Sequence, residues 1–175
     1  MYCGRCAMRY FLMCLLAGVA LAGCQTTAEQ AVPFDPKAAA FINVQGAGKI
    51  DGHAFYRSET GRVIYAAGEK VWLIPRTPYT DRRFQQLYGE GKYAQAKWLP
   101  TTEADPEYVK HTRSTKAESN GRFSFDRVGA GEYYVATVVT WRPEGAMFVS
   151  GGAIYEKVVL TGKETEPVKV IVSGK

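Results

Sequence analysis

From Lys49 onward, short runs of β-branched and aromatic residues alternate with turn residues, and this pattern constrains the fold more than any other feature of the chain. The clearest turn is Asn120-Gly121, after which Phe123 and Phe125 alternate with polar residues. Asn-Gly is typical of a two-residue type I′ hairpin turn, in which both central residues have positive φ. An alternation with a period of two predicts a strand with one buried and one exposed face.

Several such segments follow one another with turn residues between them. Residues 71–74 are apolar at every position, which is typical of a strand that is covered on both faces. Short strands at this spacing are typical of two packed sheets. We therefore predict an all-β fold, an antiparallel Greek-key β-sandwich of about seven strands. The candidate segments are residues 50–56, 63–66, 71–74, 111–117, 122–125, 132–141, 153–160 and 168–172.

A partly helical insertion, at about residues 78–109, interrupts this series. Thr80 is a suitable N-cap for a helix from Asp81 to Tyr88, and Gly89 is a suitable end. The insertion is rich in aromatic and basic residues, which are common anchors of protein interfaces and of sugar sites. Two interpretations stay open: the rings bind a partner, or they seal the insertion onto the sandwich. The candidate partner-binding residues are Arg83, Phe84, Tyr88, Tyr93 and Trp98.

The amino-terminal segment predicts export from the cytoplasm. Arg5 and Arg9 precede an apolar stretch of about 14 residues, which is shorter than the roughly 20 that a transmembrane helix needs. The stretch ends in Leu21-Ala22-Gly23-Cys24, which resembles the lipobox of bacterial lipoprotein signals. The resemblance implies cleavage before Cys24 and acylation of its sulfur. Gln25 after the cysteine resembles the sorting signal of outer-membrane lipoproteins, so we expect a lipid-anchored protein of the cell envelope, in the outer membrane and facing the periplasm.

These features divide the chain into three parts. Residues 1–23 are the predicted signal peptide, although Met1 and Met8 are both candidate start positions. Residues 24–48 are the lipidated cysteine and a polar tether, in which Phe41 to Val44 could instead dock on the domain or add an edge strand. Residues 49–175 are the β-sandwich with its insertion. All four cysteines lie at or before Cys24, so no disulfide is expected in the domain.

The segment from Ser119 to Val135 resembles the carboxypeptidase regulatory-like domain family. That family's pattern combines a polar turn, Gly-x-Phe-x-Phe, a short apolar link and Gly-x-Tyr. The resemblance implies a transthyretin-like (prealbumin-like) β-sandwich and a non-catalytic accessory or binding module. The positions that match are Gly121, Phe123, Phe125, Val128, Gly131 and Tyr133.

The composition argues against several classes of function. There are 22 basic and 17 acidic residues, and no run of five basic residues that would follow a phosphate backbone, so nucleic acid is not an expected partner. His53 and His111 have no metal-binding or catalytic spacing and are interpreted as strand-surface residues. We expect no enzyme and no cofactor. The sequence leaves two functions open: a binding module for an envelope protein or glycan, and a structural subunit of an envelope or secretion assembly.

Overall fold

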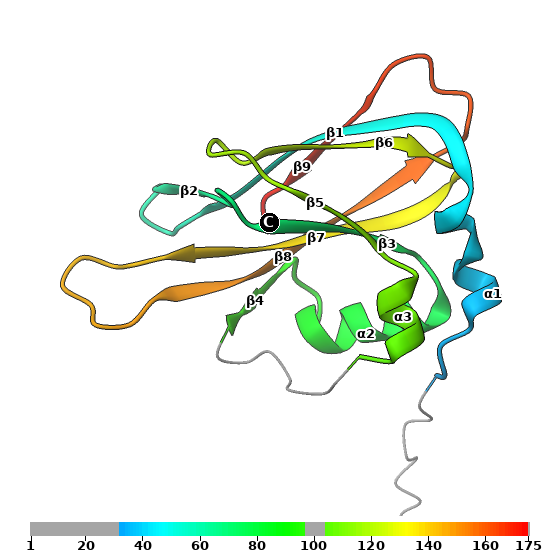
Figure 1. The fold of residues 1–175 in the computed structure, drawn as a ribbon. Coiled ribbons are helices and arrows are strands. Elements are labelled where there is room, and N and C mark those ends of the chain that lie inside the picture. Colours follow the sequence, from blue (N-terminus) through cyan, green and yellow to red (C-terminus); the bar gives the residue numbers. More distant parts are fainter. Residues whose placement is uncertain (1–31, 97–103, 175) are drawn as a thin grey trace, which may run out of the picture. The chain divides into compact units, whose positions relative to one another are not determined.

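The computed structural model describes residues 32–96 and 104–174, which form two packed β-sheets (Figure 1). In the first sheet β1 pairs with β2, β6 and β9, and the second sheet has the order β4-β8-β7-β3-β5. The two sheets confirm the predicted all-β sandwich. The strands are β1 (Gln45–Arg57), β2 (Val63–Tyr65), β3 (Lys70–Pro75), β4 (Tyr93–Gln95), β5 (Arg113–Lys116), β6 (Arg122–Val128), β7 (Gly131–Trp141), β8 (Ser150–Leu160) and β9 (Val168–Val172).

The central strand β3 shows why residues 71–74 are apolar throughout. Val71 and Leu73 face the core between the two sheets, whereas Trp72 and Ile74 belong to a second cluster on the other side of the second sheet. Successive side chains of a strand point to opposite faces, so a strand without polar positions must be covered twice. The prediction of a doubly covered strand is confirmed.

Strand β9 differs from a purely antiparallel arrangement, because it pairs with β1 in parallel, with Ile50 opposite Val168. All the other strand pairs in the described residues are antiparallel. The chain reaches β9 by crossing from β8 in the second sheet to the first sheet. This crossover connection is what permits a parallel neighbour, since a tight hairpin can only join antiparallel strands.

The Asn120-Gly121 turn joins β5 to β6, but it is not the predicted type I′ turn. Gly121 has φ +81°, whereas Asn120 is not among the residues with positive φ. The amide of Glu118 bonds to the carbonyl of Arg122, and the amide of Gly121 bonds to the carbonyl of Glu118. These bonds define a three-residue loop in which only the last residue needs positive φ. The sequence located the turn correctly, but the prediction of its type was wrong.

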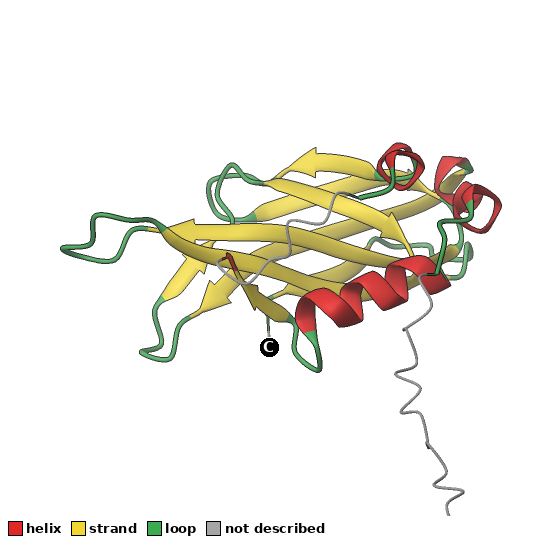
Figure 2. Cartoon of the chain, turned by 90° about the horizontal axis from the view of Figure 1, so that it is seen from below, coloured by secondary structure: helices red, strands yellow, loops and turns green. Residues whose placement is uncertain are grey.

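The insertion begins where the sequence predicts it, with α2 (Pro78–Tyr88), and continues through β4 to α3 (Pro106–Lys110). The N-cap of α2 is Thr77 rather than Thr80, because Thr77 and Thr80 bond to each other's backbone amides in a capping box and Pro78 occupies the first turn. Gly89 ends the helix as expected. Figure 2 shows α2 lying across the outer face of the second sheet.

The folded domain starts earlier than the predicted boundary at Lys49. A short helix α1 (Pro36–Ala39) and a 3-10 turn η1 (Ala40–Asn43) precede β1, which already begins at Gln45. Phe41 packs on Tyr133, with 5.2 Å between ring centroids, so this part of the expected tether docks on the sandwich. The predicted signal peptide 1–23, Cys24 and the segment up to Ala31 lie outside the described residues.

Tyr133 explains part of the Gly-x-Tyr pattern at the start of β7. Its hydroxyl donates a hydrogen bond to the carbonyl of Gly129 at 2.9 Å, and its side chain is fully buried. A Cβ on Gly131 would lie 2.5 Å from the ring of Phe41, so this position has no room for a side chain. The turn, the buried tyrosine and the docked amino-terminal segment therefore depend on one another.

Candidate functional site

The aromatic residues of the insertion seal it onto the second sheet. Phe84 and Tyr88 of α2 are only 4% and 9% exposed. The Phe84 ring lies parallel to that of Tyr134 at 4.0 Å between centroids, and Tyr88 contacts Tyr155 at 4.4 Å. These two predicted partner-binding side chains face the sheet rather than the solvent. Their position agrees with the second of the two interpretations left open by the sequence.

Arg83 and Tyr93, two further predicted residues, lie in different clusters rather than on one exposed surface. The Arg83 guanidinium lies over the ring of Tyr108, 5.7 Å from its centroid. Tyr93 of β4 stacks on Tyr56 at 4.6 Å, in a separate cluster at the edge of the main core. Trp98 lies outside the described residues. Partner binding by this set stays a prediction.

Charged groups around α2 are already paired within the domain. The Arg76 guanidinium forms ion pairs with Asp81 and Glu132, and the Tyr134 hydroxyl donates to Asp81. Burial raises the pKa of Tyr108 to about 12, and burial also raises the pKa of Tyr88. These tyrosines stay neutral at physiological pH. Around α2, Arg76, Asp81, Glu132 and Tyr134 thus satisfy one another.

The outer face of the first sheet is different, because no helix of residues 32–96 and 104–174 covers it. Along β1, Ile50 and Ala54 are fully buried and face the core, so Asp51, His53 and Phe55 point to the opposite face. The register then places specific neighbours beside them. Asp51 lies between Lys169 of β9 and Ser124 of β6. His53 lies between Ile171 of β9 and Arg122 of β6, and Phe55 lies opposite Tyr65 of β2.

An aromatic group occupies one end of this face. The His53 ring lies nearly parallel to that of Tyr65, with 5.4 Å between centroids and an angle of 17°. The Phe55 ring contacts both of them, at steep angles of 60° to His53 and 76° to Tyr65. Tyr65 is 44% exposed although it is a large ring. An exposed tyrosine face next to polar groups is suited to stacking on the apolar face of a sugar ring.

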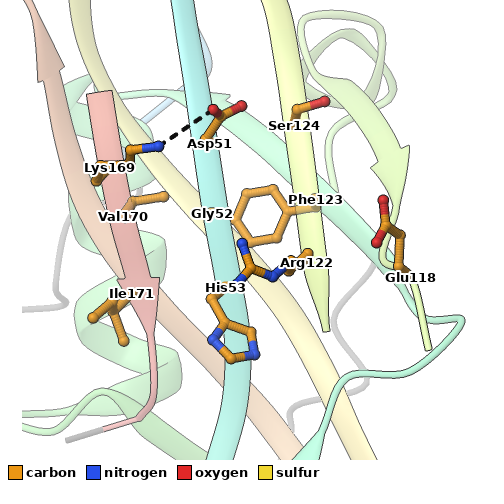
Figure 3. A pocket seen from close by; sticks show the side chains of 10 residues that line it. All are labelled: Asp51, Gly52, His53, Glu118, Arg122, Phe123, Ser124, Lys169, Val170 and Ile171. Atoms are coloured by element: carbon orange, nitrogen blue, oxygen red, sulfur yellow. Dashed lines mark ion pairs between the residues drawn. The ribbon is translucent and has the colours of Figure 1, made fainter. Parts of the chain in front are cut away.

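A shallow depression of about 460 Å³ lies beside this group. Figure 3 shows Asp51 and Lys169 on one side of it, Arg122 and Glu118 on the other, and His53 at one end. Asp51 forms exposed ion pairs with Lys49 at 3.5 Å and Lys169 at 3.6 Å. Within residues 32–96 and 104–174, the Arg122 guanidinium has no side-chain partner.

The hydrogen bond of His53 determines what its free nitrogen can do. Its Nε2 lies 2.8 Å from the carbonyl oxygen of Asn120. A carbonyl oxygen only accepts, so Nε2 carries the proton and the Nδ1 of the neutral ring is an acceptor. The face therefore offers an acceptor at His53, acceptors at Asp51 and donors at Arg122. Sugar hydroxyl groups, which both donate and accept, match such a mixture.

Sequence reasoning placed His53 on a strand surface, which the structure confirms, but did not identify this face as a site. The available signal was the alternation Asp51-x-His53-x-Phe55, in which each outward position has chemical function. His111, the other histidine, is the C-cap residue of α3, and its Nδ1 lies 2.8 Å from the carbonyl oxygen of Glu107. It was predicted to lie on a strand, and that prediction was wrong.

Within the described part of the chain, no three histidine, cysteine or acidic side chains gather as a metal site would require. No helix in residues 32–96 and 104–174 has the length and apolar character to cross a bilayer.

Comparison with known proteins supports the fold and one class of function. No family model matches the chain, and no curated protein matches it. The crystal structure of a proposed carbohydrate-binding protein from Pseudomonas aeruginosa is similar, with a TM-score of 0.68 and 25% sequence identity. The similarity covers 82% of this chain and 99% of that protein. This neighbour is described as a binding protein rather than an enzyme, which is compatible with a non-catalytic binding module.

Proposed function

We propose that this protein is a non-catalytic glycan-binding module of the cell envelope, and that it binds sugar on the outer face of the first sheet. The observation that carries the proposal is the exposed Tyr65 ring, stacked on His53 beside the Arg122 guanidinium, which has no side-chain partner among the described residues. The fold shared with a proposed carbohydrate-binding protein supports the same class of ligand.

The geometry suggests how a sugar would be held. The apolar face of a pyranose ring stacks on Tyr65, and this contact excludes water from both surfaces. The sugar hydroxyl groups then donate to Asp51 and to Nδ1 of His53, and they accept from the unpaired Arg122. The depression is shallow and open, so it fits a short segment of a longer glycan better than an enclosed small molecule.

The proposal includes the anchor that the leader sequence predicts. Cleavage before Cys24 and acylation of its sulfur would attach the domain to a bilayer, in the outer membrane and facing the periplasm. One acyl chain gives only reversible binding, but two or more give a stable attachment. Membership of the carboxypeptidase regulatory-like family is part of the same proposal, and the buried Tyr133 with its bond to Gly129 supports it.

Affinity electrophoresis in gels that contain envelope polysaccharides tests the glycan site. The full chain is purified in a polyoxyethylene detergent, which carries no sugar. We expect retardation by at least one glycan, and we expect Tyr65→Ala to weaken binding by about tenfold, which corresponds to about 1.4 kcal/mol. Phe148→Ala is the matched control, because Phe148 is an 80% exposed ring on the β7–β8 hairpin and does not line the depression. Equal loss in both variants, or no retardation of the parent chain, would contradict the proposal.

Mass spectrometry of the protein from its native membrane tests the anchor. The expected product begins at Cys24 and carries acyl chains, and a Cys24→Ser variant stays unprocessed. An intact leader, or a free thiol at Cys24, would reject this part of the proposal and leave the glycan site untouched.

A structural subunit of an envelope assembly is the second candidate, and one observation favours it. Met147, Phe148 and Val149 on the β7–β8 hairpin are 84%, 80% and 57% exposed. Consecutive exposed apolar residues are a common mark of a protein contact. Purification from detergent-solubilised membranes separates the candidates, since a complex of fixed stoichiometry that Phe148→Asp disrupts would favour the subunit.

A further inference from the structure

A second, smaller cavity lies at the end of β6, away from the proposed glycan face. It has a volume of about 240 Å³ and lies where η1 leads into β1. Its polar lining residues are two arginines, Arg113 and Arg127, and two residues with amide side chains, Asn43 and Gln45. Ile42 and Val44 complete the lining, which includes no acidic residue.

Arg113 is held in place by the backbone. Its Nη2 donates to the carbonyl oxygen of Asp126 at 2.6 Å, and its Nη1 donates to that of Arg127 at 3.2 Å. A guanidinium has five N–H groups, so three remain free for another acceptor. No carboxylate in the described ranges forms an ion pair with Arg113 or Arg127.

Arg127 has an unusual backbone conformation. Its φ of +55° makes it the only residue other than glycine with positive φ among those described. This conformation is uncommon for a long side chain and costs about 1 kcal/mol or more, which glycine at the same position would avoid. The distortion lies beside the register shift between Gly48 and Ile50, opposite the end of β6. The chain thus accepts strain at an exposed residue whose side chain lines the cavity.

We propose that this cavity binds an oxyanion, such as a carboxylate or phosphate group of a ligand. Guanidinium groups bind such groups through paired, charge-assisted hydrogen bonds. Two uncompensated cations that line one cavity repel each other, and an anion between them removes this cost. Asn43 and Gln45 add neutral donors. This inference does not depend on the glycan proposal, because no residue is shared between the two linings.

Titration calorimetry of the full chain in a polyoxyethylene detergent tests the inference. The probes are inorganic phosphate and galacturonate, with galactose as the neutral comparison, all at constant ionic strength. We expect saturable binding of at least one anion. Any heat from galactose belongs to the proposed glycan face and should be the same in the parent chain and in the Arg127 variants. Tighter binding of phosphate would point to a phosphorylated ligand, and tighter binding of galacturonate to an acidic sugar; both outcomes support an oxyanion site.

Arg127→Gly separates binding from stability. It removes a guanidinium and relieves the strained φ, so we expect anion affinity to fall by about tenfold or more while the unfolding temperature does not decrease. Arg127→Asn is a second variant, because asparagine also tolerates positive φ. Arg142→Gln, an exposed arginine of the β7–β8 hairpin, is the control and should bind as the parent chain does. Unchanged affinity in both Arg127 variants, or no anion binding by the parent chain, would overturn the inference.

Discussion

The outer faces of the two sheets are covered to different degrees. The second sheet carries α2 and α3, and its outward residues Trp72, Tyr134 and Tyr155 lie in an aromatic cluster with Phe84 and Tyr88 (Figure 2). In the described part of the chain no helix lies on the first sheet, and its outward rings, His53 and Tyr65, remain accessible. Aromatic residues thus serve stability on one face and are available for binding on the other.

This difference teaches that aromatic density alone does not identify a binding surface. The insertion has more rings than the exposed face, but two of its rings, Phe84 and Tyr88, are buried against the sheet. A ring contributes to binding only if solvent still reaches its face. Removing one aromatic ring from each face, Phe84 from the covered one and Tyr65 from the bare one, tests this comparison.

The largest effect is expected for Phe84→Ala. The ring is 4% exposed and stacks on Tyr134 at 4.0 Å, so its removal leaves a cavity under α2. We expect the free energy of unfolding to fall by about 3–5 kcal/mol, as measured by urea denaturation. Glycan retardation at room temperature should not change. A loss below 1 kcal/mol would show that the insertion does not depend on this contact.

Gly52→Ala is expected to have the next largest effect, from the core side of the first sheet. A Cβ at Gly52 would lie 2.0 Å from Cζ of Phe123, so the ring must move. Overpacking of this kind costs about 1–3 kcal/mol, which urea denaturation also measures. Gly91→Ala is the control, because its nearest contact would be 3.5 Å away. If both variants are equally stable, the packing of Phe123 over Gly52 is incorrect.

Tyr65→Ala should change stability little, in contrast to Phe84→Ala. The ring is 44% exposed and its main contact is the stack on His53, which is worth about 0.5–1.5 kcal/mol. Thermal unfolding should therefore show a small shift, while affinity for the glycan falls. A destabilisation as large as that of Phe84→Ala would mean that the two faces do not differ in the way described.

The smallest effect concerns the β8–β9 connection, which links the two sheets. Hydrogen bonds from Thr161 and from the amide of Gly162 lower the pKa of the Glu164 carboxyl from 4.5 to about 2. Because the folded pKa is the lower one, the carboxylate stabilises the fold above pH 4.5, and this contribution is lost as the pH falls towards 2. We expect Glu164→Gln to lower the unfolding temperature slightly at pH 7.

The pH dependence provides the check on this last prediction. The difference in unfolding temperature between the parent chain and Glu164→Gln should shrink between pH 4.5 and 2. High salt should reduce it as well, since the group is exposed. A difference that does not change with pH would show that charge at Glu164 is not involved.

Local sequence patterns predicted much of the architecture. The apolar run 71–74 indicated a strand covered on both sides, and Pro78 marked the start of the insertion. They were less informative about details that depend on several residues at once, such as the cap at Thr77 and the three-residue loop at Gly121. Each of these depends on hydrogen bonds whose partners are chosen only when the neighbouring strand or turn is in place.

The amino-acid sequence by itself indicated most of the strands, because the period of two records which side of each strand is buried, but it did not indicate β4. The segment that we predict to be a leader, and the proposed acylation of Cys24, were likewise inferred from the sequence alone. Only the folded chain decided which sheet face is covered and that Tyr65, His53 and Arg122 meet on the bare one. The hydrogen bond from the Arg113 guanidinium to the carbonyl oxygen of the strained Arg127 also depends on the folded chain. The reason is that register and sheet order join residues far apart in the chain, and no local pattern contains that information.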